Sequence, residues 1–278
     1  DHGINLNGST GTTVGGLAVG AGNVIAYNGD SNEKGVRIGA GTGHQIIGNT
    51  IHSNAGDGVG ILAGTGHTVQ RNAIYANGER GIDIYNDGVT PNDALDLDGG
   101  PNNTMNFPVL YSVVVSGGNL TVTGEARPGA TVEFFKAAPD VPSGHGEGRF
   151  FIGSGVVSGA TAGTVDASAR QFSFTFPAGS MAAGDWLTAT ATDGGGSTSE
   201  FSANVVATAV APGITVTPTT GLDTTEDGGT AAFTVVLETQ PSANVVFSLA
   251  SSAPGEGTVG SASLTFTPGN WNVARTVI

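Results

Sequence analysis

Five oxygen-bearing side chains suited to a metal ion lie close together near the middle of the sequence: Asp93, Asp96, Asp98, Asn102 and Asn103. Glycines at positions 99 and 100 permit a tight loop between them. Hard cations such as Ca²⁺ bind about six to eight oxygen atoms from carboxylates, amides and carbonyls. The sequence therefore predicts a Ca²⁺ site here, although the spacing differs from that of an EF-hand, which needs a glutamate at the end of its loop.

The same residues are also typical of a turn-rich cap. Asp and Asn side chains bond to the nearby backbone in Asx turns, and such turns would close the open end of the structure that precedes them. The residues alone leave both interpretations open. A thinner acidic cluster in the last quarter of the chain gives a second, weaker metal prediction: Asp223, Glu226 and Asp227.

Several side chains suited to proton transfer are predicted to face solvent: Arg37, His44, His52, Asp57, His67, Arg71 and Asp83. A polysaccharide lyase needs such a base beside a cation, and a glycosidase needs paired carboxylates. However, His44 and His67 recur 23 residues apart, each within Gly-Thr-Gly-His, and Asp83 has no acidic counterpart at Gly60. This recurrence favours a structural corner over a catalytic pair, so no catalytic residue is assigned.

A repeat precedes the acidic stretch and must position it. The pattern Asn-x-Ile-x-x-Asn begins at Asn23, Asn49 and Asn72. A glycine and an alternating apolar triplet follow each copy, and these glycines (35, 58 and 81) are spaced at intervals of 23 residues. A fixed period in the twenties with short apolar runs indicates a solenoid. An irregular earlier copy at residues 3–14 brings the expected total to about four coils.

Stacked coils place equivalent residues directly above one another, about 4.8 Å apart. Three inward apolar columns are predicted: Ile25, Ile51 and Ile74; Val36, Val59 and Ile82; Ile38, Ile61 and Ile84. Asparagine ladders are predicted at the bends, because Asn tolerates left-handed backbone and its amide bonds to the amides above and below. Asn23, Asn49 and Asn72 form the first predicted ladder, and Asn28, Asn54 and Asn77 form the second.

Longer strands without a period follow from about residue 108. Expected strands in this segment are 119–124, 131–136, 150–153, 171–176, 186–191 and 200–205. Phe172, Phe174 and Phe176 alternate with polar residues, which indicates one buried face. The polar loop 140–147 is expected to be solvated, with ligand contact as the alternative. Pro212-Gly213 opens a last block, with strands expected at 214–218, 231–237, 243–249 and 263–271.

Three resemblances follow from these motifs. The Asn-x-Ile-x-x-Asn and Gly-Ile/Val-x-Ile elements resemble the right-handed parallel β-helix repeat. The sequence from Gly124 to Phe135 resembles bacterial Ig-like modules. The Calx-β module is resembled by two segments, Thr225–Thr230 and Leu264–Trp271. They imply an all-β fold with a short right-handed parallel β-helix and an acidic C-terminal cap (1–107), an Ig-like β-sandwich (108–211) and a Calx-β-like β-sandwich incomplete at its C-terminus (212–278).

Charge and composition exclude some classes of function. The net charge is −14, and only nine Lys and Arg residues are present, which argues against binding nucleic acid. Carboxylates remain free for divalent cations. The chain has no cysteine, so it has neither disulfides nor zinc-thiolate sites. No apolar run reaches the length of about 18 residues that a membrane-spanning helix needs.

The resemblances imply a non-catalytic, structural or adhesive segment of a large bacterial protein, secreted or at the cell surface: a stalk, adhesin or filament subunit. Both ends of the sequence read as cut from a longer chain. Expected partners are neighbouring modules or copies of the chain, through end-to-end or strand pairing. The alternatives are a carbohydrate-active β-helix, which is lyase- or epimerase-like or binds glycan, and a spacer stiffened by Ca²⁺.

Overall fold

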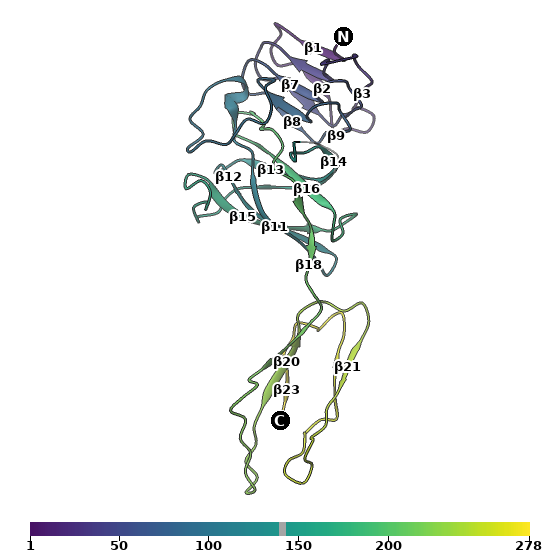
Figure 1. Ribbon diagram of the computed structural model, residues 1–278, viewed down its shortest axis with the longest axis vertical. Coiled ribbons are helices and arrows are strands. Elements are labelled where there is room, and N and C mark those ends of the chain that lie inside the picture. Colours follow the sequence, from purple (N-terminus) through teal and green to yellow (C-terminus); the bar gives the residue numbers. More distant parts are fainter. Residues whose placement is uncertain (139–142) are drawn as a thin grey trace. The chain divides into compact units, whose positions relative to one another are not determined.

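The computed structural model describes residues 1–138 and 143–278, and strands dominate it (Figure 1). The first part of the 140–147 loop lies outside the described residues. The chain divides into two compact units: residues 1–115 with 119–208, and residues 116–118 with 209–278. Among the described residues, no helix is long and apolar enough to cross a membrane, and the single helical element is the short η1 (Pro101–Thr104).

Unit 1 begins with stacked coils whose strands form three parallel sheets. The first sheet contains β1 (Ile4–Leu6), β4 (Val36–Ile38), β7 (Val59–Ile61) and β10 (Ile82–Ile84). The second contains β2 (Thr13–Gly15), β5 (Gln45–Ile47) and β8 (Thr68–Gln70). The third contains β3 (Val24–Ala26), β6 (Thr50–His52) and β9 (Ala73–Tyr75). Three full coils and the first strand of a fourth are therefore present.

The three predicted apolar columns are confirmed by the strand register. Ile25, Ile51 and Ile74 are partners in successive coils, and so are the members of the two columns that run through β4, β7 and β10. These side chains are 0–6 % exposed and belong to one core. The earlier copy is also confirmed, because Ile4 pairs with Val36 and Val14 with Ile46. One coil cannot bury its own apolar face, so the stack itself creates this core.

The bends differ from the prediction in one respect. In the second ladder the residues that directly precede the asparagines are left-handed: Tyr27, Ser53 and Ala76, with φ between 54° and 59°. In the first ladder, Gly48 and Arg71 precede Asn49 and Asn72 with φ of 68° and 56°. The asparagines themselves do not have positive φ. Their place in the bend therefore depends on the amide group and not on tolerance of left-handed backbone.

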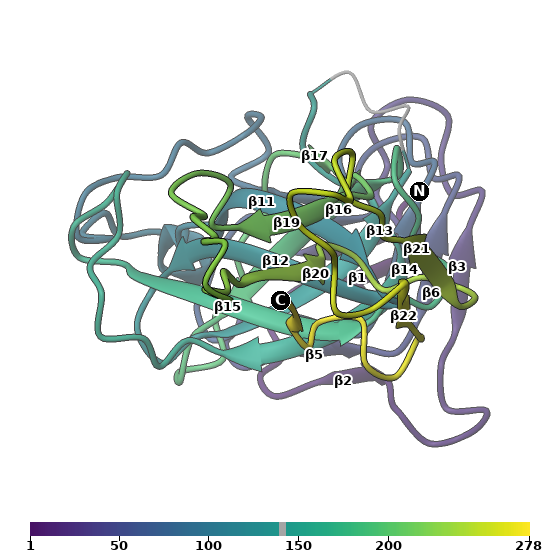
Figure 2. The same ribbon diagram turned by 90° about the horizontal axis from the view of Figure 1, so that it is seen from below.

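Two four-stranded sheets complete unit 1. One has the order β15–β12–β11–β18, and the other has the order β14–β13–β16–β17. Figure 2 shows β11, β12 and β15 side by side. The bounds are β11 (Val109–Ser116), β12 (Asn119–Ala126), β13 (Thr131–Ala137), β14 (Gly148–Val156), β15 (Arg170–Pro177), β16 (Trp186–Thr192), β17 (Val205–Val206) and β18 (Thr208–Ala209).

Both sheets contribute to a single apolar core. Phe134 from β13 is 0 % exposed, and its ring centroid lies 5.4–5.9 Å from those of Phe172, Phe174 and Phe176 on β15. The alternation along β15 is confirmed, since the intervening Ser173 and Thr175 are exposed, whereas Phe172 is buried and Phe174 and Phe176 are half-buried. The strand predicted over 200–205 forms only at its end, because Val205–Val206 pairs regularly with β16, whereas Ala203 makes an isolated bridge with His145 and Ser202 bonds to Ala189 outside a regular ladder.

Unit 2 is smaller and looser. It contains β19 (Ile214–Thr217), β20 (Phe233–Leu237) and β23 (Arg275–Val277) in one sheet, and β21 (Val245–Ser248) and β22 (Ser263–Phe266) in a second. All pairs are antiparallel. Five buried apolar residues form its core: Val235, Leu237, Leu264, Phe266 and Val277.

Candidate metal site and the closed end of the coils

The loop that follows β10 brings three of the predicted metal ligands together. Carboxylate oxygens of Asp93, Asp96 and Asp98 all lie within 4.8 Å of one another. Asp93 and Asp96 are half-buried, whereas Asp98 is exposed. Among the described residues this is the only group of three or more His, Cys, Asp or Glu side chains with ligand atoms so close.

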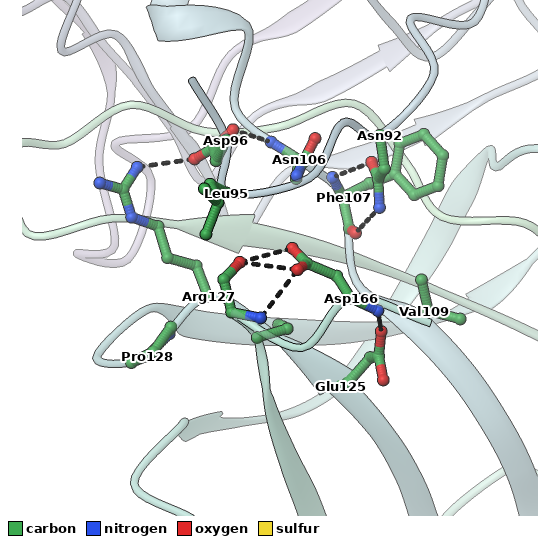
Figure 3. Close-up of a pocket in the computed structure, with 13 residues that line it drawn as sticks. Asn92, Leu95, Asp96, Asn106, Phe107, Val109, Glu125, Arg127, Pro128 and Asp166 are labelled. Atoms are coloured by element: carbon green, nitrogen blue, oxygen red, sulfur yellow. Dashed lines mark hydrogen bonds and ion pairs between the residues drawn. The ribbon is translucent and has the colours of Figure 1, made fainter. Parts of the chain in front are cut away.

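Paired hydrogen bonds hold this loop closed (Figure 3). Asn92 donates to the Phe107 carbonyl at 2.8 Å and accepts from the Phe107 N–H at 2.9 Å. Asn106 bonds in the same reciprocal way to the backbone of Asp93, at 2.7 and 3.0 Å. The Asn106 N–H donates to Asp96 at 3.0 Å. The acidic side chains thus project from a fixed loop.

The charges in this loop are poorly compensated. Burial raises the pKa of Asp96, although the Asn106 N–H and the Arg127 guanidinium, 2.7 Å away, oppose that shift. Burial raises the pKa of Asp98, and the charges of Asp93 and Asp96 raise it further. One oxygen of Asp93, Oδ1, is enclosed and has no hydrogen-bond partner among the described residues.

A divalent cation fits these observations. It would satisfy the enclosed Asp93 oxygen and relieve the repulsion between the three carboxylates. Asp93, Asp96 and Asp98 would hold it, with water and loop carbonyls completing the larger shell that Ca²⁺ prefers.

The two predicted asparagine ligands serve another purpose. Asn102 is 0 % exposed, and its Oδ1 accepts the His67 N–H at 2.7 Å. Its amide group donates to the carbonyls of His67 and Thr198 at 2.8 and 2.7 Å. Asn103 donates to Ser197 Oγ at 3.1 Å. We therefore leave both out of the proposed ligand set.

The weaker acidic cluster is not assembled into a comparable group. Asp223, Glu226 and Asp227 are exposed; Glu226 and Asp227 lie within a turn closed by an isolated bridge between Thr225 and Gly229, and Asp223 precedes it. Their carboxylates are absent from the close groups found among the described residues. Nothing in this turn favours a metal.

The recurrent histidines form a buried column, so the prediction that they face solvent is wrong. His44 and His67 are 0 % exposed, and their rings stack with centroids 5.0 Å apart. His67 Nδ1 accepts the N–H of His44, and His44 Nδ1 accepts that of Thr12. Each Nε2 lies 3.0–3.2 Å from the carbonyl four residues earlier. Both ring nitrogens are engaged, and Asn102 takes the next position in the column.

Both predicted asparagine ladders are confirmed. Asn49 Oδ1 accepts from the backbone and the side chain of Asn23 at 3.0 Å, and Asn49 donates to Asn72 Oδ1 at 3.0 Å. In the second ladder, the side-chain bonds from Asn28 to Asn54 and from Asn54 to Asn77 measure 2.7 and 2.9 Å. The polar positions of the repeat are therefore occupied by structural bonds.

Side chains from the sheets that follow close the last coil. Glu147 accepts the N–H of Asn77 at 3.1 Å and its amide group at 2.7 Å, as an asparagine of a further coil would. Glu133 accepts the N–H of Arg71 at 2.8 Å. These N–H groups would otherwise be left unpaired at the end of the stack.

Two residues after β16 continue this closure. Glu200 accepts the N–H of Ile84 at 2.8 Å and that of Thr90 at 2.9 Å. Thr198 Oγ1 accepts the N–H of Val69 at 2.9 Å. Sequence reasoning missed all of these capping residues. It expected the acidic loop to be the cap, yet residues 91–107 contribute few bonds to the end of the coils in the described structure: those of Asn102, and the Gly99 carbonyl that accepts the Tyr85 hydroxyl.

Aromatic rings cover the apolar interior at the same end. Phe135 and Phe201 belong to the core of the coils, and Phe151 packs against them. The Phe135 ring lies 5.8 Å from Phe151 and 5.7 Å from Phe201. A Cβ at Gly81 would lie 2.7 Å from the Phe201 ring, so this close approach requires glycine. The end of the coils is thus sealed by both polar and apolar groups.

Two further candidates for proton transfer, Asp57 and Asp83, are also buried, contrary to the prediction. Asp57 forms an ion pair with Lys34 at 2.6 Å. Burial, followed by the charge of Asp57, raises the pKa of Asp83 to about 6. Burial raises the pKa of Glu200 to about 7, although the N–H groups of Ile84 and Thr90 oppose this shift.

The remaining candidates do not converge on a site. Arg71 pairs with Glu133 at 3.2 Å and lies over the Phe151 ring at 3.8 Å. Arg37 bonds to Asn5 at 3.2 Å. A cavity of about 150 Å³ lies beside the acidic loop (Figure 3), lined in part by Asp96, Glu125, Arg127 and Asp166. Glu125 already accepts the N–H groups of residues 164–166 and the Tyr111 hydroxyl.

Comparison with known families agrees with the geometry of the coils. Residues 1–122 match the family model described as a right handed beta helix region. Together with the three parallel sheets, this match identifies the N-terminal part of the chain as a right-handed parallel β-helix. The matched range is less than half of the 278 residues, and it extends past β10 into β12. Among curated proteins, no match to the chain was found.

Proposed function

We propose that this chain is a non-catalytic structural or adhesive segment of a secreted or cell-surface protein, such as a stalk, adhesin or filament subunit. One observation carries the proposal. The polar side chains that recur in the β-helix, His44 with His67 and the two asparagine ladders, are engaged in hydrogen bonds between coils. Side chains used in this way stabilise the stack and leave little for chemistry on a substrate.

The later segments extend this proposal. The two sheets around one core in unit 1 support an Ig-like β-sandwich over 108–211, and the five antiparallel strands of unit 2 support a Calx-β-like sandwich over 212–278. Modules of these kinds would serve as spacers or as contacts between chains.

Association with neighbouring modules or copies would use the other end of the β-helix. The last coil is closed by Glu133, Glu147 and Glu200. Asn23 and Asn28 begin the two ladders, and within the described chain their amide oxygens receive no hydrogen bond of the kind that Asn49 and Asn54 receive. Sedimentation velocity tests this: a concentration-dependent dimer or filament that Asn23→Asp weakens supports it, and a monomer at every concentration contradicts it.

A Ca²⁺ site at Asp93, Asp96 and Asp98 is the second part of the proposal. The enclosed Asp93 oxygen and the raised pKa values of Asp96 and Asp98 support it. Calorimetric titration of the full chain should give saturable heat, with unit 1 stabilised by about 1.4 kcal/mol at ten times Kd. Asp98→Asn should remove the heat, and Asp223→Asn is the matched control. Absence of both heat and stabilisation at millimolar Ca²⁺ contradicts the site.

A glycan-binding β-helix is the alternative, and one surface favours it. Tyr27, His52 and Tyr75 follow one another along the coils with ring centroids 5.5 and 4.9 Å apart, and Arg149 lies 4.9 Å from the Tyr75 ring. Aromatic edges beside an exposed guanidinium suit an anionic sugar. A glycan array, with a lyase assay for unsaturated products, decides between the two. Binding or turnover lost in Arg149→Ala would favour the alternative over the structural role.

A further inference from the structure

Lys34 and Asp57 form an unusually enclosed pair. Lys34 is 2 % exposed and Asp57 is 0 % exposed, and Lys34 Nζ lies 2.6 Å from Asp57 Oδ2. The two residues occupy equivalent positions of adjacent coils, 23 residues apart. The lysine chain crosses Gly60, where a Cβ would lie 2.2 Å from Lys34 Cδ. Only glycine leaves room there for the lysine chain, so the amine is held against the carboxyl group.

The surroundings of this pair are polar but sheltered. Asn32 Oδ1 accepts from Lys34 Nζ at 2.9 Å, and the Arg80 N–H donates to Asp57 Oδ1 at 2.9 Å. Asp83 pairs in register with Gly60, on the next coil, and is itself 2 % exposed. Burying two opposite charges costs solvation energy that their attraction offsets only in part. A reaction that removes both charges is therefore favoured at this position.

We propose that Lys34 and Asp57 are joined by an intramolecular amide bond between Nζ and Cγ. Transfer of a proton from the ammonium to Oδ2 gives a neutral amine and a neutral acid. The Nζ lone pair attacks Cγ, and the charge that develops on Oδ1 is stabilised by the Arg80 N–H. A second proton moves from Nζ to Oδ2, the Cγ–Oδ2 bond breaks, and one water leaves. No oxidant or cofactor takes part.

Two features of the site favour this condensation. The amine and the carboxyl group are held in contact, which replaces a bimolecular encounter by an intramolecular one. Enclosure in the stack restricts the return of water to the amide. The product would fasten the second coil to the third, in a chain that has no cysteine and so no disulfide. Such a cross-link limits the unfolded chain as a disulfide does.

Mass spectrometry of the purified, folded full chain tests the proposal. The expected intact mass is lower than the sequence mass by one water. Trypsin should fail to cleave after Lys34, and a branched peptide joining residues 1–37 to residues 38–71 should be found. A folded chain at the full sequence mass, with free cleavage after Lys34, overturns the proposal without need of any variant.

Lys34→Arg is the matched control, because arginine keeps the positive charge but its guanidinium is a poor nucleophile. This variant should have the full sequence mass. Asp57 precedes Gly58, and such a pair can also lose water by closing a succinimide on its own backbone. A water loss that persists in Lys34→Arg, or that mild alkali reverses in the wild-type chain, identifies the succinimide and overturns the proposal.

Discussion

Unit 1 and unit 2 are both built from β-strands, but they are stabilised in different ways. Unit 1 combines two large apolar cores with polar columns that run between coils, of which the second asparagine ladder ends on Glu147 and the histidine column ends on Asn102. Unit 2 has five buried apolar residues in about 70 positions and an open hollow of about 710 Å³ beside Ile214, Leu237 and Phe247. The comparison teaches that strand pairing alone does not make a stable module, because closure of the core decides how much each side chain contributes to the free energy of unfolding.

The largest expected difference between the units concerns aromatic core residues. Phe134→Ala should destabilise unit 1 by about 3–5 kcal/mol, because the ring is fully enclosed by three other phenylalanines. Phe247→Ala should cost unit 2 clearly less, since that ring is only partly buried and borders the hollow. Denaturant unfolding, together with calorimetry that separates the transitions of unit 1 and unit 2, measures the loss of stability in each of the two variants. Equal losses would remove the distinction between the units.

The polar ladder allows a test within unit 1. Asn49→Ala removes the acceptor for Asn23 and the donor to Asn72, and it leaves buried backbone groups unpaired. The expected loss is roughly 1–3 kcal/mol for each unpaired group. Asn23→Ala, at the exposed start of the same ladder, should cost about 1 kcal/mol or less. If the two variants melt alike, the ladder does not stabilise the coils as described.

A third expected effect is a pH dependence confined to unit 1. The folded pKa of Glu200, about 7, lies above its ordinary value, so folding binds the proton more tightly. The stabilisation this gives is complete below pH 4.5 and is lost as pH rises through 7, on the order of 3 kcal/mol. Asp83 acts in the same direction, with a folded pKa of about 6.

Thermal melting between pH 5 and 8 measures this effect, with the unit 2 transition as internal reference. Unit 1 should melt at a lower temperature as the pH rises through this range. Glu200→Gln should flatten the dependence, because the titrating group is gone while an oxygen remains for the Ile84 N–H. A slope that is unchanged in the variant would assign the titration to other groups.

The sequence was sufficient for the coils but not for their closure. Ile51 and Asn49 recur at a fixed spacing, so stacking alone places them in the core and in the ladder. Glu147 and Glu200 are not part of a repeat, and they lie 70 and 116 residues along the chain from the residues whose N–H groups they accept. For this reason, no sequence spacing predicts which N–H group each of these glutamates accepts. A single glutamate in a β-rich sequence has many possible partners.

The same limit explains three errors. The residues from Glu200 to Ser202 alternate as a strand does, but Glu200 and Phe201 bond or pack against the coils, and Ser202 bonds to Ala189 partly through its side chain, so no regular strand forms. Asn102 belongs to the histidine column, since its amide replaces a ring at the end of the stack. His44 and Asp57 look exposed from sequence because they are polar, although the coils bury them in pairs.

Hydrogen exchange on the full chain tests most directly whether the β-helix and the following sheets form one closed unit. The backbone N–H groups of Asn77 and Ile84 donate to Glu147 and Glu200. Their free energies of opening for exchange should equal that of the Phe134 N–H in the adjoining sheet. That result is predicted if the coils and sheets unfold together. Fast exchange at Asn77 and Ile84, with Phe134 still protected, would contradict the account, because the last coil would then open independently of its cap.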